Sequence, residues 1–243
     1  MLLLWALAGL LGGALVNLLI YRLLQIEREA EPVESFRRAD PRPLFCRSFV
    51  LYAFARLTGR PSCDGGPGRT AGLVELSTAV AFGLLYLRFG ADPRLLPASL
   101  YSCVLVTVFV VDWQRHLIFD LVTFPSMALS VLLTPIFFGM PLVMSLLGLA
   151  VGGVIFAVLY GIGYLVFRRE ALGQGDVKLA MVLGAMVGFP AIVVVLLVTS
   201  IIGGIAALAL VVSGRSGREY MPYGTAMCLG AFATFFLNVP SLH

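Results

Sequence analysis

Charged residues are scarce in this chain. Asp, Glu, Lys and Arg make up 12% of its 243 residues, whereas a soluble globular domain averages about 25%. Hydrophobic residues make up 60%, and the mean hydropathy is +0.98. This composition excludes a soluble globular protein and predicts an integral membrane protein. The net charge of +4 does not indicate nucleic-acid binding, because basic residues on membrane proteins more often mark cytoplasmic loops.

Strand-like alternation and internal repeats are also lacking, and long apolar runs take their place. A membrane-spanning helix needs roughly 20 such residues. The sequence therefore predicts an all-α fold: one membrane-embedded domain over 1–243, a polytopic bundle of about eight transmembrane helices. The expected spans cover 2–21, 72–90, 95–111, 117–138, 142–166, 177–190, 191–212 and 222–240. A polar loop at about 23–71 is expected between the first two spans.

The first apolar run lacks the charge order of a secretory signal peptide. No basic residue precedes it, but Tyr21 and Arg22 follow it, so we expect a retained anchor. Arg and Lys gather in the segments 22–70, 112–116, 167–178 and 213–219. The positive-inside rule makes these segments cytoplasmic and, with an even number of spans, puts both termini outside.

Two aspartates stand at the mouths of expected spans. Asp112 ends a long apolar run, and Asp176 stands in Gly173-Gln174-Gly175-Asp176-Val177-Lys178 just before another. Carboxylates at such places are costly and usually functional. Both fall at the cytoplasmic face on different helices, so they can converge. Neighbouring carboxylates share a proton and can supply one acid and one base, which predicts a membrane aspartyl protease.

Residues around the two aspartates are expected to support them. Gly173 and Gly175 would permit tight turns and close approach of a peptide substrate. Lys178 is expected to orient the site at the membrane interface rather than to take part in catalysis. Asp120 and Glu75 are further candidates for a supporting or substrate-binding role.

Simpler interpretations of these residues stay open. Asp176 could be the N-cap of the helix that follows it, and Asp112 could pair with Arg115. Asp120 could cap or orient the next span, and Glu75 could be a structural hydrogen-bonding residue. Two other classes of protein also stay open. A secondary transporter would use Asp112 and Asp176 as proton or cation sites, and a non-catalytic assembly subunit would use them only to set topology.

Five ordered motifs carry a resemblance to a known family. They are Gly12–Arg22, Val74–Leu76, Asp112–Asp120, Leu172–Leu179 and Pro222–Gly224. With them the chain resembles the bacterial prepilin peptidases, the type 4 prepilin leader peptidases and N-methyltransferases, a GxGD-type membrane aspartyl protease family. The resemblance implies catalysis by Asp112 and Asp176 at the cytoplasmic face of the bacterial inner membrane.

The same resemblance implies a substrate and a second reaction. The substrate would be a type 4 prepilin or a type II secretion pseudopilin precursor, which loses its basic leader. Hydrolysis would need no cofactor, whereas S-adenosylmethionine would serve N-methylation of the new N-terminus. Membrane lipid is the other expected partner.

The chain departs from the family at two places. Phe119 stands where the family usually has Pro before the second aspartate of the first motif. Many members carry two CxxC pairs in the first cytoplasmic loop, a zinc-site pattern, but this chain has only Cys46 and Cys63 there. Because two thiolates do not complete a tetrahedral site, we expect no structural zinc. The missing cysteines affect a loop implicated in methyl transfer and leave the hydrolytic motifs intact.

Overall fold

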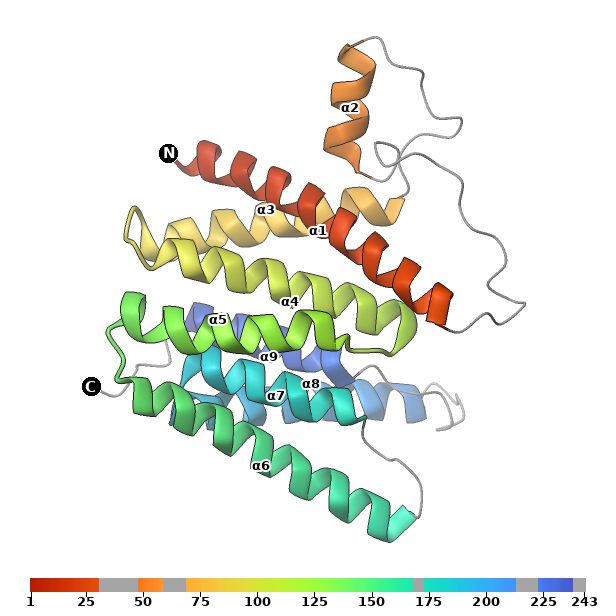
Figure 1. The fold of residues 1–243 in the computed structure, drawn as a ribbon, viewed down its shortest axis with the longest axis vertical. Helices are drawn as coiled ribbons and strands as arrows, with labels where there is room; N and C mark the ends of the chain where they lie inside the picture. The colour runs from red at the N-terminus through yellow and green to blue at the C-terminus, as the bar shows by residue number, and fades with distance from the viewer. Residues whose placement is uncertain (31–47, 59–68, 168–172, 213–222, 238–243) are drawn as a thin grey trace. The chain divides into compact units, whose positions relative to one another are not determined.

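The computed structural model describes residues 1–30, 48–58, 69–167, 173–212 and 223–237, and those residues form helices with no strand (Figure 1). The all-α class expected from the sequence is confirmed. The chain separates into two compact units, Met1–Leu95 and Leu96–His243. The single peptidase domain expected over 1–243 stays a prediction.

The first unit is a pair of long helices with a short one attached. It contains α1 (Leu2–Ala30), α2 (Phe49–Leu57) and α3 (Arg69–Phe89), and α2 contacts both long helices. Glycines let α1 and α3 approach closely. A Cβ atom added to Gly9 would lie 2.7 Å from the Cα of Ala79, and one added to Gly13 would lie 2.6 Å from the Cα of Glu75. Such small residues, spaced four apart, allow backbone contact between membrane helices.

The second unit is built around α7. Its helices are α4 (Leu95–Arg115), α5 (Asp120–Phe138), α6 (Leu142–Phe167), α7 (Gln174–Val187), α8 (Ala191–Val212) and α9 (Tyr223–Leu237). The short helix α7 packs against α5, α6, α8 and α9 (Figure 1). Its Leu179 and Leu183 are fully buried. Although α7 is short, its contacts with four other helices place it at the centre of this unit.

Glycines also explain how α7 fits into so crowded a place. A Cβ atom added to Gly184 would lie 2.1 Å from the carbonyl oxygen of Gly148 in α6. One added to Gly152 would lie 2.4 Å from the carbonyl oxygen of Ala180. The backbones of α6 and α7 are thus in direct contact along these positions. The glycine content of the sixth expected span indicates such close packing.

Five of the described helices are long and apolar enough to cross a membrane. These spans are Leu2–Glu27, Thr70–Phe89, Leu95–Arg115, Asp120–Phe138 and Leu142–Leu165. Shorter apolar segments, Ala191–Ala206 and Tyr223–Phe235, lie in α8 and α9. The chain is a multi-pass helical membrane protein. Each expected span coincides with a helix, but crossing by α7, α8 and α9 and the orientation of the bundle stay predictions.

Helix ends differ from the expected span ends. The helix α1 continues to Ala30 instead of ending at 21, and α7 begins at Gln174 instead of 177. Hydropathy marks the apolar part of a helix, whereas backbone hydrogen bonds continue into its polar flanks. Cys46, Cys63 and Pro222 lie outside the described residues, so the zinc expectation stays a prediction.

Candidate active site

Asp112 is held by the beginning of a helix far along the chain. It lies near the end of α4 and is buried. Its Oδ2 accepts a hydrogen bond of 2.7 Å from the backbone N–H of Thr225 in the first turn of α9. The first N–H groups of a helix lack intrahelical partners, so Asp112 and α9 satisfy each other. Sequence analysis missed this role of Thr225.

Gly224 makes room for the Asp112 carboxyl group. A Cβ atom at Gly224 would lie 2.9 Å from both Cγ and Oδ2 of Asp112. One at Gly175 would lie 2.8 Å from the Cβ of Ile118, in the segment between α4 and α5. The space beside Gly175 is therefore filled by Ile118 of the same chain. The substrate-binding role expected for Gly175 stays a prediction.

Asp176 lies in the first turn of α7, where Gly173 is the N-cap residue. Its Oδ2 accepts a hydrogen bond of 3.2 Å from the Gly173 N–H, and its own N–H donates to the Gly173 carbonyl oxygen at 3.1 Å. The bond from the Gly173 N–H to the Asp176 carboxyl group is one of the two hydrogen bonds of a capping box. The interpretation of Asp176 as the N-cap is therefore wrong in position, because the helix begins before it. The carboxyl group still caps the helix.

The two carboxyl groups are close enough to interact electrostatically. Asp176 precedes the expected span 177–190, and its side chain is buried. Burial, and then the charge of Asp112, raise the pKa of Asp176 to about 6, against the lowering effect of the Gly173 N–H. The structure thus brings together the two aspartates that the sequence singles out. A proton can remain on such a pair well above the pH at which an ordinary aspartate loses it.

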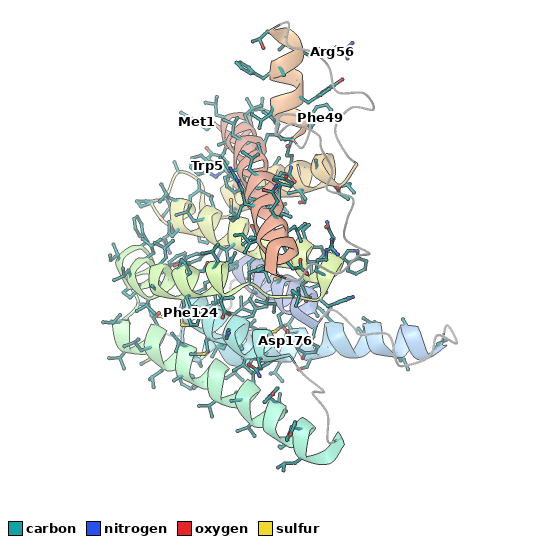
Figure 2. All side chains as sticks on the ribbon, turned by 45° about the vertical axis from the view of Figure 1, so that its right-hand side comes forward. Met1, Trp5, Phe49, Arg56, Phe124 and Asp176 are labelled. Atoms are coloured by element: carbon teal, nitrogen blue, oxygen red, sulfur yellow. The ribbon has the colours of Figure 1, made fainter. Side chains whose placement is uncertain are left out.

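Asp120 and Lys178 form an ion pair beside the aspartates. The Lys178 Nζ donates to Oδ1 and Oδ2 of Asp120 at 2.6 and 2.8 Å. It also lies 5.5 Å from the centre of the Phe124 ring. Figure 2 labels Phe124 on α5 and Asp176 on the adjacent α7. The pair joins the beginnings of these two helices, which fits the orienting role expected for Lys178 and a supporting role for Asp120.

Glu75 belongs to the first unit, where it is buried. Its Oε1 accepts from Asn17 Nδ2 at 3.1 Å and from the Phe49 N–H at 2.9 Å, and its Oε2 accepts from the Val50 N–H at 3.0 Å. These contacts join α1, α2 and α3. They favour the structural interpretation of Glu75, and its substrate-binding role stays a prediction.

Fold and site together have the arrangement of a membrane aspartic peptidase: two buried carboxyl groups, from separate helices of a multi-pass bundle, close enough for the charge of one to act on the other. The comparisons with known proteins agree. The type IV leader peptidase family matches residues 99–208, a range that includes both aspartates. No solved structure matches the chain significantly.

Three relatives are each named prepilin leader peptidase/N-methyltransferase. That of Xanthomonas campestris is 29% identical over 76% of this chain and 66% of its own length. That of Myxococcus xanthus is 32% identical over 86% of this chain and 63% of its own length. That of Dickeya chrysanthemi is 30% identical over 97% of this chain and 93% of its own length. The chain thus spans slightly less than two thirds of the first two relatives. It belongs to the type IV leader peptidase family.

Replacing Gly224 by Ala should impair peptidase activity. The added methyl group would displace the Asp112 carboxyl group, and displacements approaching 1 Å can cost about 100-fold in rate. We expect kcat/KM to fall by roughly 10- to 100-fold. The matched control is Gly161→Ala in α6, where an added Cβ meets nothing within 4 Å. Equal activities of the two variants would contradict the role assigned to Gly224.

Reversing both charges of the Asp120–Lys178 ion pair should preserve the stability and kcat/KM that reversing either charge alone lowers. Asp120→Lys and Lys178→Asp each place like charges together, whereas the double variant restores an opposite pair. Because the side chains are 54% and 30% exposed, we expect a coupling free energy of about 0.2–1 kcal/mol. Thermal unfolding and kcat/KM of all four proteins measure it.

The control for the ion pair is Asp92→Asn, which breaks the exposed Asp92–Arg94 pair of the first unit. It should leave kcat/KM unchanged. Additive losses in the Asp120→Lys, Lys178→Asp double variant would show that the ion pair does not join α5 to α7 energetically.

Proposed function

We propose that this chain is a prepilin leader peptidase. It would cleave the basic leader from type 4 prepilin or type II secretion pseudopilin precursors at the cytoplasmic face of the bacterial inner membrane. The observation that carries the proposal is that buried Asp112 and Asp176 lie close enough for the charge of Asp112 to raise the pKa of Asp176, in a chain of the type IV leader peptidase family. The names of the relatives support the substrate class.

The proposed reaction divides two roles between the aspartates. Asp176, whose pKa is raised to about 6, is the protonated member and donates a proton to the oxygen of the scissile carbonyl. Asp112, ionised beside the Thr225 N–H, takes a proton from water as the water oxygen attacks the carbonyl carbon. The tetrahedral intermediate then collapses. Its C–N bond breaks, the leaving nitrogen receives the proton from Asp112, and the carbonyl reforms as its proton returns to Asp176.

Charge and hydropathy support the proposed location. Arg and Lys gather in the segments that precede Asp176 and follow Asp112, which favours a cytoplasmic position for both. A precursor with a basic leader in the cytoplasm and an apolar helix in the bilayer would present its cleavage site at that level. The protein would thus act at the boundary between water, the source of the nucleophile, and lipid.

We extend the second activity in the relatives' names, N-methyl transfer, to this chain as part of the proposal. S-adenosylmethionine would supply the methyl group to the new amino terminus. Glu75 does not fit as a residue that holds this cofactor. Three donors from its own chain occupy its carboxylate, which has only about four lone-pair sites. We therefore assign no residue to the methyl-transfer step.

Asp112→Asn and Asp176→Asn should each abolish leader cleavage. Neither amide can exchange the catalytic proton, so we expect kcat/KM to fall by at least about 100-fold. The assay uses purified protein with a prepilin precursor, and gel filtration verifies folding. Asp120→Asn should retain most activity, because Asp120 only pairs with Lys178. Robust cleavage by either Asp112→Asn or Asp176→Asn would rule out the proposed dyad.

Methylation of the intact precursor should depend on cleavage. With S-adenosylmethionine labelled in its methyl group, we expect wild-type protein to label the mature chain. Asp176→Asn should label only a pre-cleaved substrate, because only that substrate has the free amino group. Failure of wild-type protein to label the pre-cleaved substrate would show that the chain lacks the second activity.

A further inference from the structure

Among the described residues, the short helix α2 has an apolar side that is largely exposed. Phe49, Phe54 and Leu57 are 57%, 64% and 87% exposed, whereas Ala55 is buried. At 3.6 residues per turn the three exposed side chains fall on one half of the helix, opposite Ala55. A helix of nine residues with such a side buries little against its own unit, so this side needs an apolar environment from elsewhere.

The beginning of α2 is held by hydrogen bonds to Glu75 of α3. Ser48 is its N-cap residue, and the Ser48 Oγ accepts from the Leu51 N–H at 3.1 Å. The N–H groups of Phe49 and Val50, the first two residues of the helix, both donate to the buried carboxylate of Glu75. Glu75 therefore serves the helix N-terminus, where an anion is favourable.

Glu75 and its partner Asn17 both belong to helices that are candidate membrane spans. Glu75 belongs to the span Thr70–Phe89. At 1.5 Å per residue, it lies about 8 Å from the beginning of that span. Asn17, which donates to Glu75 and to the carbonyl oxygen of Ala71, belongs to the span Leu2–Glu27. The first turn of α2 is thus linked, through Glu75, to two helices that are long and apolar enough to span a membrane.

The direction of α2 completes the argument. Within the first unit, α2 leaves the α1–α3 pair at a steep angle instead of running along it (Figure 1). Phe49 lies at its attached end and Arg56 near its free end (Figure 2). A helix that leaves the α1–α3 pair at a steep angle near the beginning of α3 can run along the bilayer surface. Its basic residue, in the last turn, can then meet lipid phosphate groups.

We propose that α2 is an interfacial helix that lies in the headgroup region of the lipid bilayer. Phe49, Phe54 and Leu57 insert among the upper acyl chains, Arg56 binds lipid phosphate, and Glu75 sets the depth of the helix. The partner is the lipid surface itself. This inference concerns a surface apart from the two aspartates and does not rest on the proposed peptidase function.

Depth-dependent fluorescence quenching tests the proposal on the full chain. Phe54→Trp is made with Trp5→Phe and Trp113→Phe, which removes both native tryptophans. The protein is reconstituted into vesicles of phosphatidylcholine and phosphatidylglycerol that carry bromine near the headgroup end or near the tail end of the acyl chains. We expect roughly twofold stronger quenching by the shallow bromines, because interfacial helices lie about 5–10 Å deep.

Two further variants test the role of Glu75. Glu75→Gln has a single acceptor oxygen for two backbone N–H groups, so quenching by shallow bromines should fall by about half as the helix detaches. Ser77→Ala, on the same helix, should leave quenching unchanged. Gel filtration of each reconstituted variant, re-extracted in detergent, verifies that it remains folded.

Other outcomes would overturn the proposal. Quenching by acrylamide in water but by neither lipid would place α2 in solution. Lipid quenching that decreases as protein density in the vesicles rises would assign the apolar side to a second copy of the chain. Unchanged quenching in Glu75→Gln would remove Glu75 as the residue that sets the depth.

Discussion

Among the described residues, the three buried acids each accept a hydrogen bond from a backbone N–H at the beginning of a helix. Asp112 accepts from α9, Asp176 from the N-cap of α7, and Glu75 from α2. The first N–H groups of a helix are themselves without partners. Each contact therefore satisfies a donor and an acceptor that would both be costly to bury alone.

Glycines make these contacts geometrically possible. The carboxyl group of Asp112 occupies the space where a Gly224 side chain would be, and the backbone of Gly13 lies against Glu75. Along α6 and α7, Gly148 and Gly184 bring the two backbones together and hold the helix that carries Asp176. Small residues and buried acids are thus parts of one arrangement. Helices must approach closely before the end of one can reach the carboxylate of another.

The sequence predicted the parts of this arrangement that depend on local composition. Every span expected from an apolar run falls on a helix of the structure, because hydropathy measures the cost of exposing a segment to lipid or water. Charge asymmetry and span ends predicted that Asp112 and Asp176 converge. The sequence did not reveal that Thr225 binds Asp112 or that Gly173, not Asp176, is the N-cap of α7. These are contacts of single N–H groups, which every residue except proline possesses.

The number of donors separates the structural acid from the two candidate catalytic ones. Among the described residues, Glu75 accepts three hydrogen bonds, whereas Asp112 and Asp176 each accept one. A carboxylate with three donors has little capacity left to bind another molecule. One donor fixes the orientation of the carboxyl group and leaves its other lone pairs for water or a peptide carbonyl. The same contact with a helix N-terminus can therefore anchor α2 at Glu75 and prepare Asp112 and Asp176 for chemistry.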